Sequence, residues 1–222
     1  MLVEPGPLTP PRTRGRGRPV GSDSEATRVQ ILDAARAVIA ERGYHAATFQ
    51  QIALRAGVSR PTLHYYFATR DEVYEILLRD AYTRVAECAV AAQGESGLQN
   101  QLTVFIEQMQ RLVLPDAAAM QFLVTARLEH HRGRPRTDAA DAVVASVHGF
   151  YHSIVMQAIA HGELAADSDP RAVADMLAAL FWGMGFYAGF VDATGATEIA
   201  RQLLRMFETG LLDQRVGAPV QA

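Results

Sequence analysis

Two short helical patterns that share one tight turn constrain this chain more than any other feature of its sequence. Thr48-Phe49-Gln50-Gln51 has the spacing of a capping box, in which a Thr or Ser and a Gln or Glu three residues later close the start of a helix. Gly57 ends this pattern, and Ser59 can cap a second helix that tolerates Pro61 in its first turn. The spacing predicts two short helices joined by a tight turn at Gly57-Val58.

Longer helices are expected on both sides of this pair. Ser22-Asp23-Ser24-Glu25 predicts the start of a first helix that ends at Gly43, and Thr69-Arg70-Asp71-Glu72 predicts a longer helix that Gly94 interrupts. No segment has the alternating pattern of a strand. We therefore predict an all-α chain of about nine helices, the last five of them near 98–114, 116–131, 137–161, 170–191 and 197–212.

The chain is expected to divide into four parts. Residues 1–21 hold five of the ten prolines together with Gly and Arg, which predicts a flexible arm. Hydrophobic residues make up 49% of the chain, so the remainder can fill a core. We expect a three-helix helix-turn-helix domain over 22–70, a second helical domain over 71–214 and a tail over 215–222.

Basic side chains are biased toward the N-terminus. Residues 1–80 carry 11 Arg and 9 acidic residues, a net charge of +2, whereas residues 81–222 carry 10 Arg and 15 acidic residues, a net charge of −5. This bias barely favours a nucleic-acid partner over a solvated surface, so the motifs must decide.

Location follows from what the sequence lacks. The single Cys88 excludes an internal disulfide and is expected to be a packing residue, and the N-terminus has no apolar export segment. The apolar segment 176–191 is bounded by Asp175 and Asp192 and falls short of the roughly 20 residues that span a membrane. We expect a cytoplasmic protein with no membrane partner, in which this segment is a buried helix.

The second short helix indicates a function for the pair. Two short helices joined by a tight turn form a helix-turn-helix, whose second helix enters the major groove of DNA. An ordinary helical hairpin has the same spacing, so the side chains distinguish the two. The exposed positions are rich in hydrogen-bond donors and flat rings, which suit phosphates and bases. These positions are Arg60, Thr62, His64, Tyr65 and Tyr66.

Five motifs around this pair form a pattern: Thr48-Phe49-Gln50-Gln51-Ile52-Ala53, Ala56-Gly57-Val58-Ser59, Thr62-Leu63, Tyr66-Phe67 and Arg70-Asp71-Glu72. They resemble the N-terminal signature of the TetR family of bacterial repressors. The resemblance implies that Thr48 touches phosphate and that Ser59, Arg60 and Thr62 begin the recognition helix. His64 and Arg70 depart from the Tyr and Lys usual in the family, although Arg70 keeps a phosphate-binding charge at a helix start.

The arm adds a second candidate for DNA contact. Arg14-Gly15-Arg16-Gly17-Arg18-Pro19 resembles the core of an AT-hook, whose arginines enter the minor groove of A·T tracts. A bare basic tail that raises affinity in a salt-dependent way is the alternative. The full set of expected DNA-contacting residues is Thr48, Gln50, Ser59, Arg60, Pro61, Thr62, His64, Tyr65, Arg70, Arg16 and Arg18.

Two C-terminal helices suit an interface between two chains. Residues 172–191 are apolar nearly all round, with glycines that let another backbone approach, and the final helix has an apolar stripe. Two such helices from each of two chains would form a four-helix interface, and the resemblance implies the same homodimer. The expected interface residues are Met176, Leu180, Gly183, Tyr187, Ile199, Leu203 and Phe207.

Large, adaptable side chains lie between the motif and this interface. Such residues most often form plain core, but the resemblance implies a cavity for a small-molecule effector. His148 and His152 have metal-ligand spacing, yet hydrogen bonding is the preferred interpretation, and no metal or cofactor is expected. The expected ligand-binding residues are Phe105, Met109, Met120, Phe122, Phe150, Tyr151, Phe181 and Trp182.

These expectations combine into a dimeric, ligand-responsive repressor that binds a palindromic operator in double-stranded DNA. The helix that starts at Asp71 would transmit ligand binding by changing the separation of the two reading heads. An architectural binder of A·T-rich DNA without ligand control is one alternative. An enzyme is the other, disfavoured because the sequence has no Gly-x-Ser-x-Gly, phosphate-binding glycine loop or zinc motif, so no catalytic residue is expected.

Overall fold

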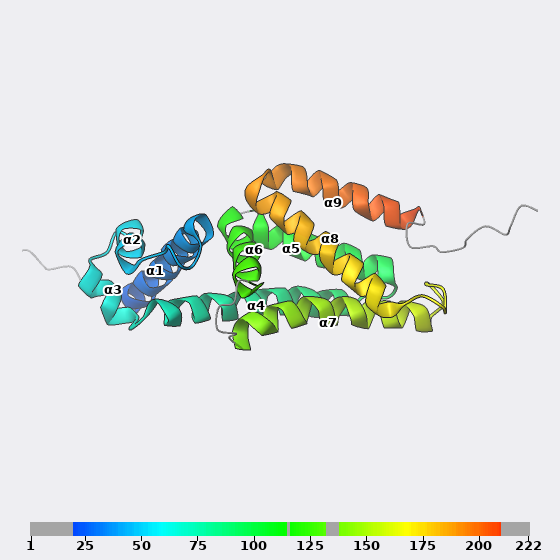
Figure 1. Cartoon of the computed structure of the whole chain (residues 1–222), viewed down its shortest axis with the longest axis horizontal. Helices are drawn as coiled ribbons and strands as arrows, with labels where there is room; N and C mark the ends of the chain where they lie inside the picture. Colours follow the sequence, from blue (N-terminus) through cyan, green and yellow to red (C-terminus); the bar gives the residue numbers. More distant parts are fainter. Residues whose placement is uncertain (1–19, 115, 132–137, 210–222) are drawn as a thin grey trace, which may run out of the picture.

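The computed structural model describes residues 20–114, 116–131 and 138–209, and this part of the chain forms nine helices and no strand. The N-terminal unit contains α1 (Val20–Arg42), α2 (Phe49–Arg55) and α3 (Arg60–Tyr66), and the long α4 (Arg70–Gln93) follows it. The remaining helices are α5 (Leu98–Val113), α6 (Ala117–His131), α7 (Asp138–Ala160), α8 (Pro170–Phe190) and α9 (Ala193–Glu208). The all-α prediction is confirmed (Figure 1).

Two helix starts differ from the prediction. α1 begins at Val20, so the capping pattern expected at Ser22 lies within the helix. α9 begins four residues earlier than expected, because the Asp192 carboxylate accepts a hydrogen bond from the backbone N–H of Thr194. The extra turn of α9 carries Ala193 and Ala196, which line a cavity described below.

The caps that begin α2, α3 and α4 lie where the sequence predicts them. Thr48 and Gln51 form a complete capping box, in which each side chain satisfies the other residue's backbone N–H. Ser59 and Thr69 each accept a hydrogen bond from the N–H three residues later. The Glu72 carboxylate does not complete the third box, because it accepts from the backbone N–H that precedes Thr69, at 2.8 Å.

Two apolar cores meet within α4. Its first half contributes Val73 and Leu78 to the core of α1–α3, and its second half contributes Val85 and Ala92 to the core of the C-terminal bundle. Figure 1 shows α4 running from the N-terminal unit along the bundle. The division expected between residues 70 and 71 falls at the start of a helix that both cores share.

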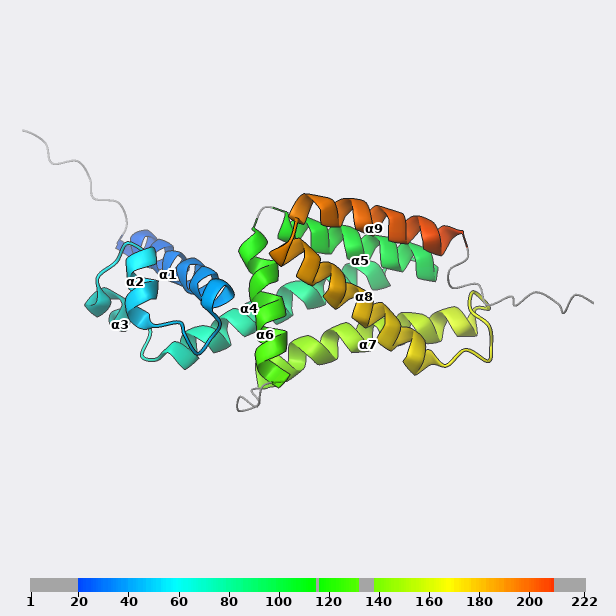
Figure 2. The same ribbon diagram turned by 45° about the horizontal axis from the view of Figure 1, so that its top comes forward.

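The helix α6 also belongs to both halves. In Figure 2 it stands across the bundle, beside the N-terminal unit. Its Phe122 is buried in the N-terminal core, with its ring centroid 5.7 Å from that of Tyr74. Just before α6, the Asp116 carboxylate pairs with the Arg36 guanidinium of α1 at 2.7 Å. The N-terminal unit therefore touches the bundle through α6 as well as through the continuous α4.

The C-terminal bundle packs around a cluster of aromatic rings. Phe105 stacks on Phe150 with centroids 4.4 Å apart, and Phe181 lies 5.7 Å from Phe105. α8 and residues 141–160 of α7 are long and apolar enough to cross a membrane by length and composition alone. Core helices of soluble proteins pass the same test, and these two helices pack on each other, with α7 also on α4 and α8 also on α6 and α9.

Candidate nucleic-acid interface and ligand cavity

The orientation of α3 is fixed at its start and along its inner face. Ser59 Oγ accepts a hydrogen bond from the backbone N–H of Thr62 at 3.1 Å and lies 2.7 Å from the Thr62 hydroxyl. Leu63 on the inner face is fully buried. The turn before the helix needs the left-handed backbone of Gly57, whose φ is +62°. These contacts fix which side chains of α3 face away from the protein.

The outward face of α3 is polar and exposed. Arg60 is exposed and has no ion-pair partner among the described residues, and Tyr65 is 82% exposed. The His64 ring lies 5.0 Å from the Phe49 ring of α2, centroid to centroid, which restricts its orientation. The face can offer an unpaired guanidinium, an imidazole and a phenol to a partner. These are groups that recognise bases and phosphates.

The start of α2 adds a second polar edge. Thr48 and Gln50 are exposed there. The Thr48 hydroxyl donates to the side-chain oxygen of Gln51 at 3.1 Å while it accepts from the Gln51 backbone N–H. A phosphate that received a hydrogen bond from Thr48 would therefore replace the bond to the Gln51 side chain.

Arg70, a predicted DNA-contacting residue, makes several contacts within the protein. Its guanidinium donates to the backbone carbonyls of Ala47 at 2.9 Å and His45 at 3.3 Å, and it lies 4.1 Å from the centre of the Tyr44 ring. The Tyr44 hydroxyl in turn donates to the Asp71 carboxylate. The structure makes Arg70 a positioning residue for the turn before α2, because its charge is occupied inside the protein. The other predicted arginines, Arg16 and Arg18, lie outside the described residues.

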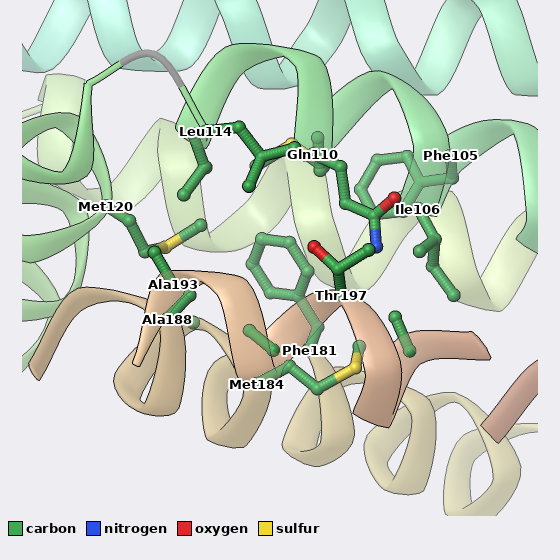
Figure 3. A pocket seen from close by; sticks show the side chains of 15 residues that line it. Phe105, Ile106, Gln110, Leu114, Met120, Phe181, Met184, Ala188, Ala193 and Thr197 are labelled. Carbon is green, nitrogen blue, oxygen red and sulfur yellow. The ribbon is translucent and has the colours of Figure 1, made fainter. Parts of the chain in front are cut away.

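A cavity lies between α5, α6, α8 and α9, with an empty volume of about 500 Å³ that includes space open to solvent. Four of the eight predicted ligand-binding residues line it: Phe105, Met109, Met120 and Phe181. Sequence reasoning missed Gln110, Met184, Gly185, Ala188 and Thr197, which complete much of its wall (Figure 3). Met184, Gly185 and Ala188 of α8 follow Phe181 at helical spacing, so the sequence could have predicted that they share its face of the helix.

The other four predicted ligand-binding residues lie elsewhere. Phe150 and Tyr151 pack behind Phe105 in the core, where burial raises the pKa of the Tyr151 hydroxyl and keeps it neutral. Phe122 packs in the N-terminal core and lines a separate pocket together with Met109 and Met120. Trp182 lines a smaller pocket, where the Arg127 guanidinium lies 5.8 Å from its ring centre.

One face of α8 and α9 leaves large apolar side chains exposed. Among the predicted interface residues, Met176 and Ile199 are each 40% exposed and Gly183 is exposed, whereas Leu180, Tyr187 and Leu203 are half-buried. Phe207 is buried in the core of its own chain. The prediction missed Phe186 and Phe190, whose stacked rings are half exposed, with centroids 5.3 Å apart.

The histidine pair on α7 does not converge. His148 Nδ1 lies 3.3 Å from a carboxylate oxygen of Asp175 on α8, while His152 is exposed. Within the described residues, no three His, Cys, Asp or Glu side chains gather as metal ligands do. The geometry indicates a contact between an imidazole of α7 and a carboxylate of α8.

Comparison with known proteins gives the strongest similarity in the N-terminal unit. A model of the family described as bacterial regulatory proteins, tetR family, matches residues 31–77. The HTH-type transcriptional activator FasR of Mycolicibacterium smegmatis is 41% identical over 73 residues, which are 30% of this chain and 33% of FasR. The chain thus spans about a third of the length of this relative.

Similarity over the whole chain is weaker. The HTH-type transcriptional repressor Rv1474c of Mycobacterium tuberculosis is 27% identical over 171 residues, which are 68% of this chain and 89% of the repressor. The crystal structure of the transcriptional regulator FadR from Bacillus subtilis in complex with stearoyl-CoA superposes with a TM-score of 0.60 at 20% identity, covering 82% of this chain and 98% of FadR. The fold is shared, and each of these relatives is named as a regulator of transcription.

Proposed function

We propose that the chain is a regulator of the TetR family and, more specifically, a dimeric repressor whose affinity for operator DNA is lowered by a small-molecule effector. The observation that carries the proposal is the outward face of α3, where an unpaired Arg60 stands beside a cap that fixes the helix. The proposed partner is operator DNA, and the proposed location is the cytoplasm.

Base reading is assigned to the first turns of α3. In a helix-turn-helix, the N-terminal residues of the second helix reach base edges in the major groove. Arg60 is suited to a bidentate contact with guanine, and Thr62 and His64 lie on the same short helix. Thr48 and Gln50 at the start of α2 would lie against the phosphate backbone.

Dimerisation is assigned to the exposed apolar face of α8 and α9. One short recognition helix reads few bases, whereas two heads related by a two-fold axis read a palindrome about one DNA turn apart. Stacked, half-exposed rings such as Phe186 and Phe190 are costly in water, and a second copy of the chain would bury them.

Release of DNA is assigned to the two helices that join the halves. The cavity contains Met120 of α6, and two residues further along the same helix, Phe122 enters the N-terminal core. A ligand that moves α6 would also shift α1 through the pair of Arg36 and Asp116, while α4 changes the separation of the reading heads. Control of this kind requires a coupling of about 1–3 kcal/mol, and DNA must weaken ligand binding by the same factor.

The test is selection of genomic DNA fragments by the purified protein, followed by footprinting with Arg60→Ala. We expect a short palindrome and a loss of about 1–3 kcal/mol in binding when this guanidinium is removed. Arg111→Ala is the matched control, because this exposed arginine lies on α5, far along the chain from the reading head.

Two results would contradict the proposal. Broad binding to A·T-rich DNA that survives Arg60→Ala would favour the architectural alternative, in which the N-terminal arm binds. Equal losses for Arg60→Ala and Arg111→Ala would remove α3 from the interface.

A further inference from the structure

The cavity between α5, α6, α8 and α9 has a lining that restricts the chemistry of its ligand. Among the described residues, its walls are made of apolar side chains, glycine and alanine, with only two polar side chains, Gln110 and Thr197, and no charged one. We infer that it binds an uncharged molecule with an apolar body and a single carbonyl or hydroxyl group at one end. The inference rests on the proposed function, since it names the class of effector.

The two polar side chains are placed to hold such a group. Gln110 extends from α5 and Thr197 from α9, and Figure 3 shows their polar ends directed into the space between these helices. Neither side chain makes a hydrogen bond to another described residue. An amide and a hydroxyl can together donate to a carbonyl oxygen or pair with a hydroxyl. They therefore form a neutral recognition point in an otherwise apolar wall.

A charged group at this point would meet no oppositely charged side chain among the residues that the structure describes. The nearest arginines along α5 and α9, Arg111 and Arg201, lie in pairs with Glu107 and Glu198 on their own helices. A carboxylate held among apolar side chains without a cation loses its hydration and gains little in return. The lining therefore favours an uncharged ligand over the corresponding carboxylate.

The apolar end of the cavity can adapt to length. Met120 and Met184 contribute flexible thioether side chains to the wall. At Gly185 a side-chain carbon would lie 2.8 Å from the Met120 sulfur, so the glycine lets this methionine sit against α8. Small shifts of Met120 can change the depth available to an alkyl or aryl body.

The inference is tested by calorimetric titration of the full chain with ligands that differ only in charge. The probes are the methyl esters of straight-chain acids from hexanoate to tetradecanoate, their free carboxylates at neutral pH, and decyltrimethylammonium as a cation. We expect at least one ester to bind. Its affinity should exceed that of the carboxylate with the same chain length by about tenfold or more, because the site offers the carboxylate no cation. Thr197→Val and Gln110→Met should each weaken the ester several-fold, by about 3- to 10-fold for a lost neutral hydrogen bond.

Gln99→Met is the matched control on α5, because this glutamine is exposed and lies outside the cavity wall. The inference is overturned if no ester binds, if the carboxylate binds as well as its ester, or if Thr197→Val and Gln110→Met both behave like Gln99→Met. None of these results bears on palindrome binding by Arg60. Loss of the proposed function would instead appear in the footprint and leave the titrations unchanged.

Discussion

The short helices α2 and α3 of the N-terminal unit and α5 of the C-terminal bundle begin by different means. α2 and α3 have seven residues each, and each begins at a side-chain cap that lies three residues from its partner. α5 has 16 residues, and the residue before it, Gly97, has no side chain that could cap the helix. Its Leu98 N–H donates instead to the carboxylate of Glu163, which lies 65 residues further along the chain, at 2.7 Å.

In the proposed function, α3 recognises DNA, whereas the cavity in the bundle responds to the ligand. The cap of α3 depends on contacts between near neighbours, so the bundle does not take part in it directly. The cavity depends on four helices that meet only in the folded chain, so a ligand that shifts one of them changes its contacts with the others. In the proposed mechanism, Phe122 and Asp116 would pass such a shift to the N-terminal unit, because they stand on or beside α6 and contact the other half.

Truncation of Phe122 tests this connection and has the largest expected effect. The ring is 1% exposed and fills the N-terminal core from a helix of the bundle. Phe122→Ala should lower the free energy of unfolding by about 3–5 kcal/mol, as for other buried aromatic residues. Urea denaturation followed by circular dichroism measures the change. Leu128→Ala is the control, since this leucine is on α6 but 49% exposed. Equal effects of the two variants would show that α6 does not join the halves.

The same contrast explains what could be predicted from the sequence. α2 and α3 were predicted at the correct residues because their caps and the Gly57 turn act within a few positions. Phe122 and Phe207 were recognised as apolar, but periodicity does not say which partner an apolar side chain meets. Thr197 was not recognised as part of the cavity wall, because it reaches that position only when α9 packs against α5.

Loss of the Ser59 cap tests the local half of the comparison and should have a smaller effect. Ser59→Ala removes the acceptor for the Thr62 N–H and the contact with the Thr62 hydroxyl. We expect a loss of about 1 kcal/mol in unfolding free energy, the usual cost of an N-cap. Ser24→Ala is the control, because that exposed serine only accepts a 3.3 Å hydrogen bond from Tyr66. If the two variants behave alike in urea denaturation, tertiary packing rather than the cap positions α3.

Cys88 of α4 tests how tightly the C-terminal bundle is packed. Its replacement should have the smallest effect on the free energy of unfolding at neutral pH. The thiol is 5% exposed. Burial, with a smaller contribution from the Glu87 charge, raises its pKa from 9.0 to about 11. The unfolded chain loses this proton first as the pH rises, so the contribution of Cys88 to stability is complete below pH 9 and disappears through about pH 11. Urea denaturation across this range should show a weaker decline for Cys88→Ala than for the parent chain.

Thiol labelling gives the decisive reading at a pH of about 8, where the native thiol is protonated and covered. A disulfide reagent should label the native chain only at the rate at which the bundle opens, and the urea-unfolded chain at once. Rapid labelling of the native chain would mean that the bundle opens around Cys88 on α4. Distant contacts would then fix the bundle less firmly than the local caps fix α2 and α3, and the cavity would be formed in only part of the population.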